Sequence, residues 1–243
     1  LAYLQKNLGE FRIMSTDSRI LPPNFSAIYR LKSVDGYDPL YLLRYGELIA
    51  ASERKKADIN PPFGFNRIIT PHNYDSKIID LLGVKFVLSL SELESPKLKK
   101  VFQERETRVY ENINVLQRVF FVSKIIQAND NKEAVRIMFE DSFNSSNTAV
   151  VERADKEFQN LGEVSVGKAD ITYYSENKVI IETVGDTALI PGDFITRTRF
   201  EEINAEILSQ GGEPATARQT ILGITKSSLF SDSWLSASSF QET

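Results

Sequence analysis

The apolar residues of this chain come in short segments, which limits the folds open to it. The longest apolar stretch runs from Ile78 to Leu90 and is interrupted by Asp80, Gly83 and Lys85. A membrane-spanning helix needs about 20 mostly apolar residues in a row, so we expect none in this sequence. Short apolar segments separated by turn-forming residues are typical of a globular chain built from short helices and strands.

Residue usage excludes several kinds of chemistry. The 243 residues are enough for one large domain or two small ones, and they include no cysteine and a single histidine, His72. Disulfides, thiol nucleophiles and sites with several Cys or His ligands are therefore excluded. We expect no metal and no cofactor. His72 follows Pro71 and precedes Asn73 in a polar segment, and we interpret it as a surface residue rather than a catalytic one.

The charge is unevenly distributed along the chain. The formal net charge is −4. From Val184 onward there are four basic and eight acidic residues, whereas residues 1–183 carry 25 of each sign. Neither part is a basic patch, so composition does not favour nucleic-acid binding.

Hydrophobic periodicity predicts an α+β fold. In the first 183 residues, a mixed α/β part precedes a β-rich part. We expect helices at 39–50 (capped by Asp38), from Asp75 to a stop at Gly83, and after a capping box at Asn129 to Glu133. We expect strands at Val84–Leu90, 108–110 and 119–126, the last of which is central in its sheet. Residues 164–174 and 178–184 are expected to form a hairpin.

The C-terminal part differs in its sequence pattern: a short amphipathic segment is followed by a serine-rich tail. Thr198 and Glu201 form a capping box, and an apolar helical face follows it, made of Phe200, Ile203, Ile207 and Leu208. We expect one short helix ending at Gly211–Gly212. Half of the residues from Lys226 to Ser239 are serine, and such a segment has little apolar surface to offset its ordering entropy. We therefore expect a poorly ordered tail.

Catalytic motifs are absent from the sequence: it holds no phosphate-binding glycine loop, GxSxG elbow, HExxH or EF-hand loop. Asp35 and Asp38 could act as an acid/base pair, but they flank a Gly-Tyr turn, and we favour a capping role. Turn chemistry likewise explains Asp186 and Asp193. An aromatic set could stack on sugars or pack in the core, and we favour packing; the set is Tyr110, Phe120, Phe121, Tyr173 and Tyr174.

Residues 1–183 resemble a family of membrane proteins. The segments that carry the resemblance are Phe11 to Ile13, Pro23-Asn24, Ser33 to Leu40, Arg44-Tyr45, Asp80 to Leu88 and Val109 to Val122. They are similar to the extracytoplasmic region of YfhO-like bacterial membrane proteins, which are lipid-sugar-dependent glycosyltransferases. The resemblance implies a water-exposed, non-catalytic module on the extracytoplasmic face, with the transmembrane part of its parent protein as partner. Gln117 departs from the family, which commonly has Pro there.

Residues 184–243 resemble a second family, over about sixty residues nearly without gaps. The motifs are Gly185 to Thr187, Leu189 to Asp193, Arg199 to Asn204, Pro214 to Arg218, Leu222 to Lys226 and Asp232 to Thr243. They are similar to the C-terminal part of the bacterial RNA polymerase β′ subunit. The resemblance implies a clamp and switch segment that contacts other polymerase subunits and template DNA in the cytoplasm. Lys226 would contact a DNA phosphate, and Gln241 would lie near the same strand; Ser238 departs from the family's usual Ala.

These two resemblances place the two parts of the chain on opposite sides of a membrane. We expect one α+β region at 1–183, with a sub-boundary near 145–160, and a β′-like segment at 184–243 that is not an independent domain. A composite sequence joined near 178–187 is our preferred interpretation, ahead of a functional fusion. We read the chain as a non-catalytic fragment, because both resemblances lack their family's catalytic carboxylates. A generic binding domain is the third hypothesis.

Overall fold

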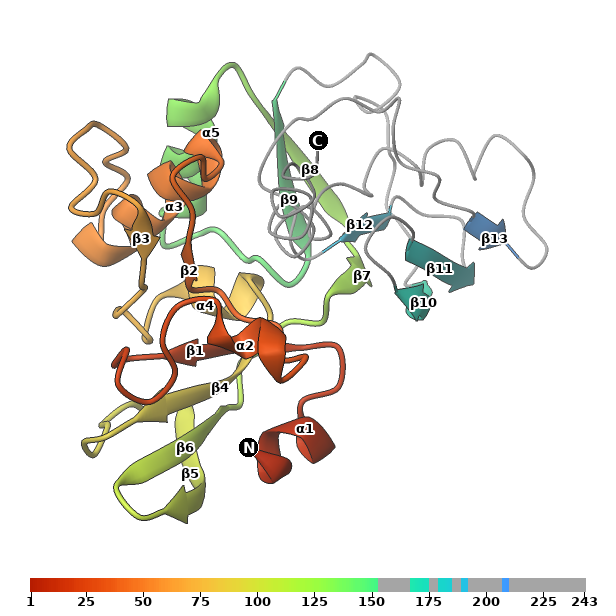
Figure 1. Cartoon of the computed structure of the whole chain (residues 1–243). Coiled ribbons are helices and arrows are strands. Elements are labelled where there is room, and N and C mark those ends of the chain that lie inside the picture. Colours follow the sequence, from red (N-terminus) through yellow and green to blue (C-terminus); the bar gives the residue numbers. More distant parts are fainter. Residues whose placement is uncertain (153–166, 175–178, 185–188, 192–206, 210–243) are drawn as a thin grey trace, which may run out of the picture. The chain divides into compact units, whose positions relative to one another are not determined.

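A computed structural model describes residues 1–152, 167–174, 179–184, 189–191 and 207–209 (Figure 1). The chain divides into two units, Leu1–Arg118 and Val119–Thr243. Both helices and strands are present in the described residues, which confirms the predicted α+β class. The predicted boundary at 183/184 and the sub-boundary near 145–160 stay predictions.

The first unit is built on a four-stranded mixed sheet in the order β1-β4-β6-β5 (Figure 1). Its strands are β1 (Arg12–Ser15), β4 (Val84–Ser89), β5 (Leu98–Glu104) and β6 (Thr107–Asn112). β1 runs parallel to β4, whereas β6 is antiparallel to β4 and to β5. The prediction of a strand at Val84–Leu90 is confirmed. A separate two-stranded ladder joins β2 (Gly36–Tyr37) to β3 (Ile68–Ile69).

One face of this sheet packs against the N-terminal helix α1 (Ala2–Asn7). Leu4 and Leu8 join Ile13, Phe86 and Leu88 in a single buried cluster. Side chains alternate along a strand, so the fully buried Met14 and Val87 point to the opposite face. A short helix, α2 (Phe25–Ile28), follows β1.

Helix α4 (Lys77–Leu81) forms where the sequence predicts it. The Ser76 hydroxyl caps the helix by accepting a hydrogen bond from the Ile78 N–H, and Gly83 lies just beyond its end at φ +68°. A positive φ is accessible to glycine without steric cost. Helix α4 contacts both β4 and α3.

Helix α3 (Leu43–Arg54) begins later than predicted and ends later. Asp38 does not cap it: the Asp38 carboxylate accepts the Leu40 N–H at 2.7 Å, and the Asp38 N–H donates to the Arg67 carbonyl at 2.8 Å. These bonds hold Asp38 beside the β2–β3 ladder, so the helix starts after Leu42. Its C-terminal cap is Lys55, at φ +56°.

The second unit contains a parallel pair of strands joined by a helix. β8 (Lys124–Ala128) pairs with β9 (Thr148–Glu152), and α5 (Asn131–Met138) connects them. The predicted capping box is confirmed: Asp130 accepts the Glu133 N–H at 2.8 Å, and Glu133 accepts the Asn129 N–H at 2.8 Å.

The prediction of one central strand at 119–126 is wrong. It is two strands, β7 (Val119–Phe121) and β8, and each pairs with a single strand among the described residues. The N–H groups of Ser123 and Lys124 both donate to the Asn147 carbonyl, at 2.9 and 3.0 Å. This break in the ladder redirects the chain from β12 (Leu189–Pro191), the partner of β7, to β9.

The predicted hairpin is confirmed as β10 (Lys168–Tyr174) antiparallel to β11 (Val179–Val184). β13 (Ile207–Ser209) runs parallel to β11, so the expected helix does not include Ile207 and Leu208. A helix of about three turns is marginal alone, whereas the edge of β11 offers backbone partners. The rest of that helix and the serine-rich tail lie outside the described residues. No helix in the described part of the chain is long and apolar enough to cross a membrane.

Candidate functional site

Polar side chains gather where the parallel strands of the first unit end. β1 ends at Ser15 and β4 ends at Ser89, and both serines are buried. A parallel bridge from Ile13 to Ser33 places a third segment beside β1, and this segment continues to Asp35. In open α/β sheets, ligands bind outside the carboxyl ends of the strands. This edge is therefore the candidate functional site of the first unit.

Asp35 is a carboxyl at this edge whose pKa is raised. It is half-buried, and burial raises the pKa of its carboxyl to about 6. Hydrogen bonds oppose this shift without cancelling it: the Ser33 hydroxyl donates to Oδ1 at 2.6 Å, and backbone N–H groups of Ser15 and Asp35 also donate. Desolvation disfavours a carboxylate more than these donors stabilise it. Asp35 thus changes charge close to neutral pH.

Tyr45 is a further polar residue whose side chain interacts with the Asp35 charge. Tyr45 of α3 is buried, its hydroxyl donates to the Val34 carbonyl, and burial raises its pKa. Arg12 of β1 is also buried and donates to the Leu82 carbonyl at 2.8 Å. The Arg12 charge and the Asp35 charge act on Tyr45 in opposite directions. The site at this edge thus holds a carboxyl and a phenol, whereas the Arg12 guanidinium lies on the Leu82 carbonyl, at the amino end of β4.

The chemistry open to this cluster is proton transfer. A carboxyl with a pKa near the working pH can accept and donate protons, and altered pKa values are enriched at functional sites, although ion-pair networks alter them too. Asp38 takes no part, because its carboxylate is bonded to the Leu40 N–H. The capping role predicted for Asp38 is wrong, since α3 begins after Leu42 without a side-chain cap, and no sequence signal identified the burial of Asp35.

His72 lies on the surface, as the sequence analysis favours. Its side chain is 62% exposed, with Nδ1 at 3.8 Å from Glu53 Oε2. Glu53 Oε1 accepts the backbone N–H groups of His72 and Asn73, each at 2.9 Å. The Glu53 carboxylate thus fixes the loop at His72 and Asn73 to the end of α3, so the contact between Glu53 and His72 has a structural role.

The predicted aromatic set is divided between the two units: Tyr110 belongs to the first unit, and Phe120, Phe121, Tyr173 and Tyr174 belong to the second. Tyr110 is buried in the first unit, where its hydroxyl donates to Glu92 Oε2 at 2.6 Å. In the second unit, Phe121 and Tyr174 pack against the buried cluster of Val119, Ala169, Val179 and Ile181. Core packing therefore explains these three aromatics. Tyr173 is exposed.

A buried ionic network lies at the opposite end of β4 and was not predicted. Lys97 Nζ donates to Asp80 Oδ1 at 2.6 Å, and Asn112 Nδ2 donates to the same oxygen at 2.7 Å. Lys97 also donates to the Ser76 carbonyl at 3.0 Å. Burial raises the pKa of Asp80, and the Lys97 charge opposes that shift. Its partners make this network structural.

Several predicted residues lie outside the described residues, namely Lys226, Gln241, Asp186 and Asp193. Among the residues that the structure describes, no group of three or more His, Cys, Asp or Glu side chains could hold a metal ion.

Comparison with known proteins finds similarity to bacterial RNA polymerases. Segments of 59 to 73 residues match curated proteins at 51–61% identity. No family model and no solved structure matches the chain.

The subunit matched is β′. The DNA-directed RNA polymerase subunit beta' of Thermobifida fusca is 61% identical over 59 residues, covering 24% of this chain and 5% of the relative. The beta' subunit of Roseiflexus castenholzii is 61% identical over 66 residues, covering 27% of this chain and 4% of the relative. The beta' subunit of Dehalococcoides mccartyi is 54% identical over 66 residues, covering 27% of this chain and 5% of the relative. The chain thus spans about one twentieth of the length of the curated relatives that it matches.

Proposed function

We propose that the chain is linked to DNA-templated transcription through a β′-derived segment at residues 184–243. The observation that carries this proposal is the identity of 51–61% over 59 to 73 residues. Residues 184–243 hold the motifs on which the resemblance rests. This segment is long enough to contain the match of 59 residues, whereas the matches of 66 and 73 residues are longer than the segment. The proposed partners are other polymerase subunits and template DNA, in the cytoplasm.

Lys226 and Gln241 are the residues proposed to contact DNA. A lysine ammonium is a flexible point charge, suited to a phosphate but not to reading bases. Gln241 would lie close to the same strand. The segment carries eight acidic and four basic residues, so we expect its DNA binding to be weak and to fall steeply with salt.

For residues 1–183 we propose a non-catalytic module, of the YfhO-like extracytoplasmic type or a generic binding domain. The first reading is supported by the sequence motifs given above. The second is supported by a groove in the first unit whose lining includes the apolar residues Leu4, Leu88 and Val109. We further propose that the two parts have separate origins, and that the chain catalyses neither glycosyl nor nucleotidyl transfer, since both resemblances lack their families' catalytic carboxylates.

The experiment that tests the β′ proposal is a salt titration of DNA binding by the full chain. Fluorescence anisotropy with a labelled single-stranded template should show binding at low salt. Lys226→Ala should weaken it and reduce the slope of log affinity against log salt by about 1, as loss of one phosphate contact does. Lys99→Ala, which removes an exposed lysine of β5, is the matched control and should change neither.

If Lys226→Ala and Lys99→Ala changed DNA binding equally, the proposed contact of Lys226 with a phosphate would be contradicted. The origin of the chain is tested separately, by long-read sequencing of genomic DNA across codons 178–187. Reads that cross the junction unbroken in independent isolates would overturn the composite explanation and leave a fusion.

A further inference from the structure

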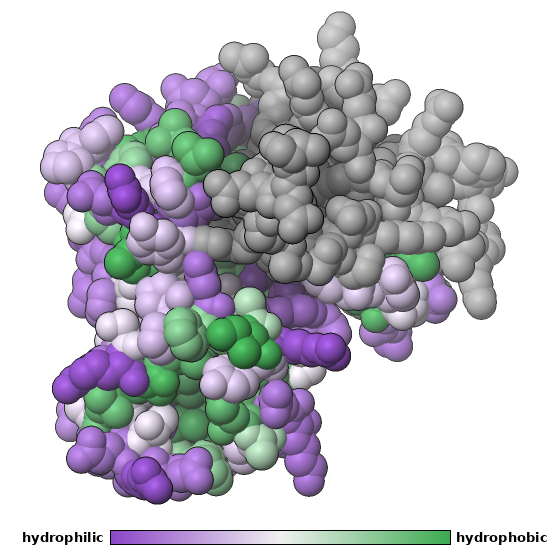
Figure 2. Space-filling view, in the orientation of Figure 1, coloured by the Kyte–Doolittle hydropathy of each residue, from purple (hydrophilic) through white to green (hydrophobic). Residues whose placement is uncertain are grey.

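The first unit exposes large apolar side chains that its core does not use. Of the ten large apolar side chains exposed among the described residues, six lie in residues 25–68, namely Phe25, Ile28, Tyr37, Leu40, Leu43 and Ile68. We call these six residues the apolar face. Single exposed apolar residues are normal, whereas a contiguous exposed patch marks an interaction site. Figure 2 shows apolar side chains gathered on the side of the first unit that carries α2.

Hydrogen bonds and strand pairing bring the members of this face together. Tyr37 of β2 is directly opposite Ile68 of β3, so the two exposed side chains share one side of the ladder. The next residue, Ile69, points to the other side and is buried. Asn24 Nδ2 donates to the Tyr37 carbonyl at 3.0 Å, and Asn24 Oδ1 accepts the Tyr37 N–H at 2.9 Å. Because Phe25 follows Asn24, these bonds hold the start of α2 beside β2.

Leu40 and Leu43 extend the apolar face toward α3. The Asp38 carboxylate accepts the Leu40 N–H at 2.7 Å, and the Asp38 N–H donates to the Arg67 carbonyl at 2.8 Å, next to Ile68. The bend that carries Leu40 is therefore fixed to the β2–β3 ladder. Leu40 is 88% exposed and Leu43 is 60% exposed. Side chains this exposed protrude from their own fold, so they suit a partner that closes around them.

The exposed charges of the segments that carry the apolar face are basic. Residues 24–44 and 61–70 hold four basic residues (Arg30, Lys32, Arg44 and Arg67) and two acidic ones (Asp35 and Asp38). Arg30 and Arg67 are exposed, two positions after Ile28 and one before Ile68. Both acidic residues are half-buried, and each carboxylate accepts a hydrogen bond. The face is thus bordered by two exposed guanidinium groups.

The acidic residues of the adjoining segments do not cancel this positive charge. Glu10, Asp17 and Asp58 form ion pairs with Lys32, Arg19 and Arg54. Glu47 of α3 is buried, and Glu53 accepts two backbone N–H groups. Helix α1 lies next to α2, because Gln5 donates to the Tyr29 carbonyl at 3.1 Å, and the charged residue that α1 brings is the exposed Lys6. An anionic partner therefore fits the apolar face better than a cationic one.

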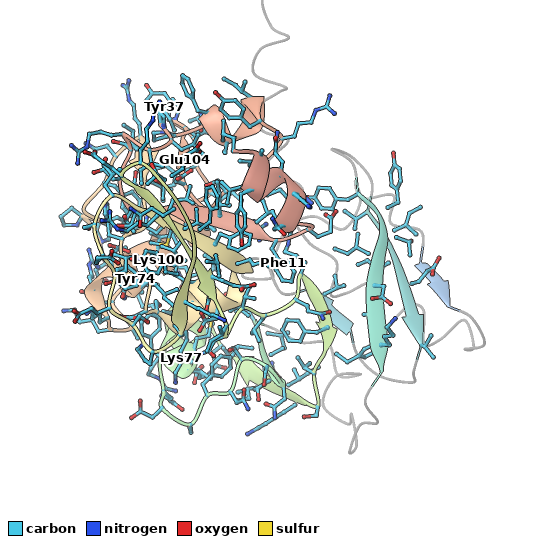
Figure 3. All side chains as sticks on the ribbon, turned by 90° about the horizontal axis from the view of Figure 1, so that it is seen from below. Phe11, Tyr37, Tyr74, Lys77, Lys100 and Glu104 are labelled. Carbon is cyan, nitrogen blue, oxygen red and sulfur yellow. The ribbon has the colours of Figure 1, made fainter. Side chains whose placement is uncertain are left out.

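We propose that the apolar face inserts into the surface of a bilayer that contains anionic phospholipids. Its side chains would lie at the boundary between head groups and acyl chains, where interfacial segments are buried about 5–10 Å deep. Arg30 and Arg67 would lie at the level of the phosphates, which a guanidinium can bind through two parallel hydrogen bonds. Tyr37, which Figure 3 shows at the outer margin of the first unit, has the apolar ring and polar hydroxyl that suit such an interface.

A bilayer accounts for these features better than a folded protein partner does. Leu40 and Ile28, which are 88% and 68% exposed, would each need a matching cavity on a folded partner, whereas acyl chains deform around them. Lipid phosphates also supply anions next to Arg30 and Arg67 without a fixed geometry. The inference goes beyond the proposed function and is independent of the β′-like segment.

The test is flotation of the full chain with two kinds of vesicle, phosphatidylcholine alone and an equal mixture with phosphatidylglycerol. We expect binding to the mixed vesicles that weakens with salt, and weaker binding to phosphatidylcholine. Arg30→Gln with Arg67→Gln should weaken binding to the mixed vesicles about tenfold or more, the scale of two basic residues at an anionic surface. Lys99→Gln with Arg105→Gln removes the same charge from exposed positions outside the face and should leave binding unchanged.

A second variant tests the apolar contribution. Leu40→Ser with Leu43→Ser should weaken binding about fivefold or more, because interfacial affinity scales with the apolar area that is buried. Ile113→Ser is the matched control, since it removes a 63% exposed apolar side chain from outside the face, and it should change nothing. Unfolding midpoints in urea should equal that of the wild type, because all these positions are exposed.

Three results would overturn the proposal. The first is no binding to either vesicle, which would leave the apolar face as a surface for a protein partner. The second is equal binding to both kinds of vesicle. The third is an equal loss of binding in the Leu40/Leu43 and Ile113 variants. If the leucine variant does not fold, the arginine variant and its control decide the question alone.

Discussion

Lys97 Nζ lies 2.6 Å from Asp80 Oδ1, with only 7% and 12% of the two side chains exposed. Asn112 donates to the same carboxylate oxygen. The pair therefore joins α4 to the residue before β5 and to the end of β6 inside the first unit.

We predict that Lys97→Met lowers the free energy of unfolding by about 3–5 kcal/mol, because it leaves the Asp80 carboxylate buried without its counter-charge. Urea denaturation followed by circular dichroism measures this. Lys99→Met, at an exposed position of β5, is the matched control and should stay within about 0.5 kcal/mol of the wild type. Similar losses in both variants would show that the pair is not the cause.

The pKa of Asp35 gives a pH dependence of defined sign. Its folded pKa of about 6 lies above the ordinary value of 3.8, so the unfolded chain releases this proton first. The Asp35 contribution therefore favours folding at low pH and is lost as pH rises from about 4 to about 6. Asp35→Asn should be more stable than the wild type at pH 8 by about 1–2 kcal/mol, less than the full shift implies because the group is half-buried.

Carboxyl carbon NMR provides the direct measurement for Asp35. The Asp35 signal should titrate near pH 6. The Asp17 signal should titrate near pH 2, because the Arg19 side chain holds the pKa of Asp17 at about 2. An Asp35 midpoint below 4.5 would contradict the burial argument, which takes 3.8 as the ordinary value.

Gly83 should resist substitution more than Gly9. Both have a positive φ, at +68° and +61°, and an L-residue there costs about 1–2 kcal/mol. A Cβ at Gly83 would also lie 3.1 Å from Arg118 Cδ, whereas one at Gly9 would meet nothing within 4 Å. Gly83→Ala should therefore destabilise the first unit more than Gly9→Ala in urea melts. Equal losses would mean that Arg118 moves aside freely.

The cap of α5 should contribute measurably to the second unit. Asp130→Ala removes the acceptor of the Glu133 N–H and should cost about 1 kcal/mol. Amide hydrogen exchange across Asn131–Met138 reports this locally, with faster exchange in the first turn. Asp141→Ala, an exposed residue beyond the helix, should leave the exchange rates unchanged. Unchanged exchange in the Asp130 variant would contradict the capping role.

The elements that the sequence predicted correctly are those set by local chemistry. Ser76 and Gly83 bound α4, and Asp130 with Glu133 starts α5, because each makes its bonds within a few residues. The predicted start of α3 is wrong because Asp38 does not cap the helix. The Asp38 N–H donates to the Arg67 carbonyl, which lies 29 positions away, and local periodicity cannot predict this bond.

The candidate site was less predictable than the helices. The chemistry of Asp35 depends on burial beside β1, through a bridge that pairs Ser33 with Ile13. Tyr3 and Phe102, whose rings stack with centroids 4.7 Å apart, are likewise 99 positions apart in the sequence. Neither arrangement follows from spacing, because it depends on the order of strands in the sheet.

The pairing of Ile207–Ser209 with Ile181–Thr183 bears on how this protein can be handled. Truncation after residue 183 would remove β13 and uncover unsatisfied backbone groups along β11, next to the deeply buried Ile181. An open strand of this kind is a template for self-association. A chain cut to residues 1–183 should therefore associate with itself on concentration more readily than the chain of 243 residues.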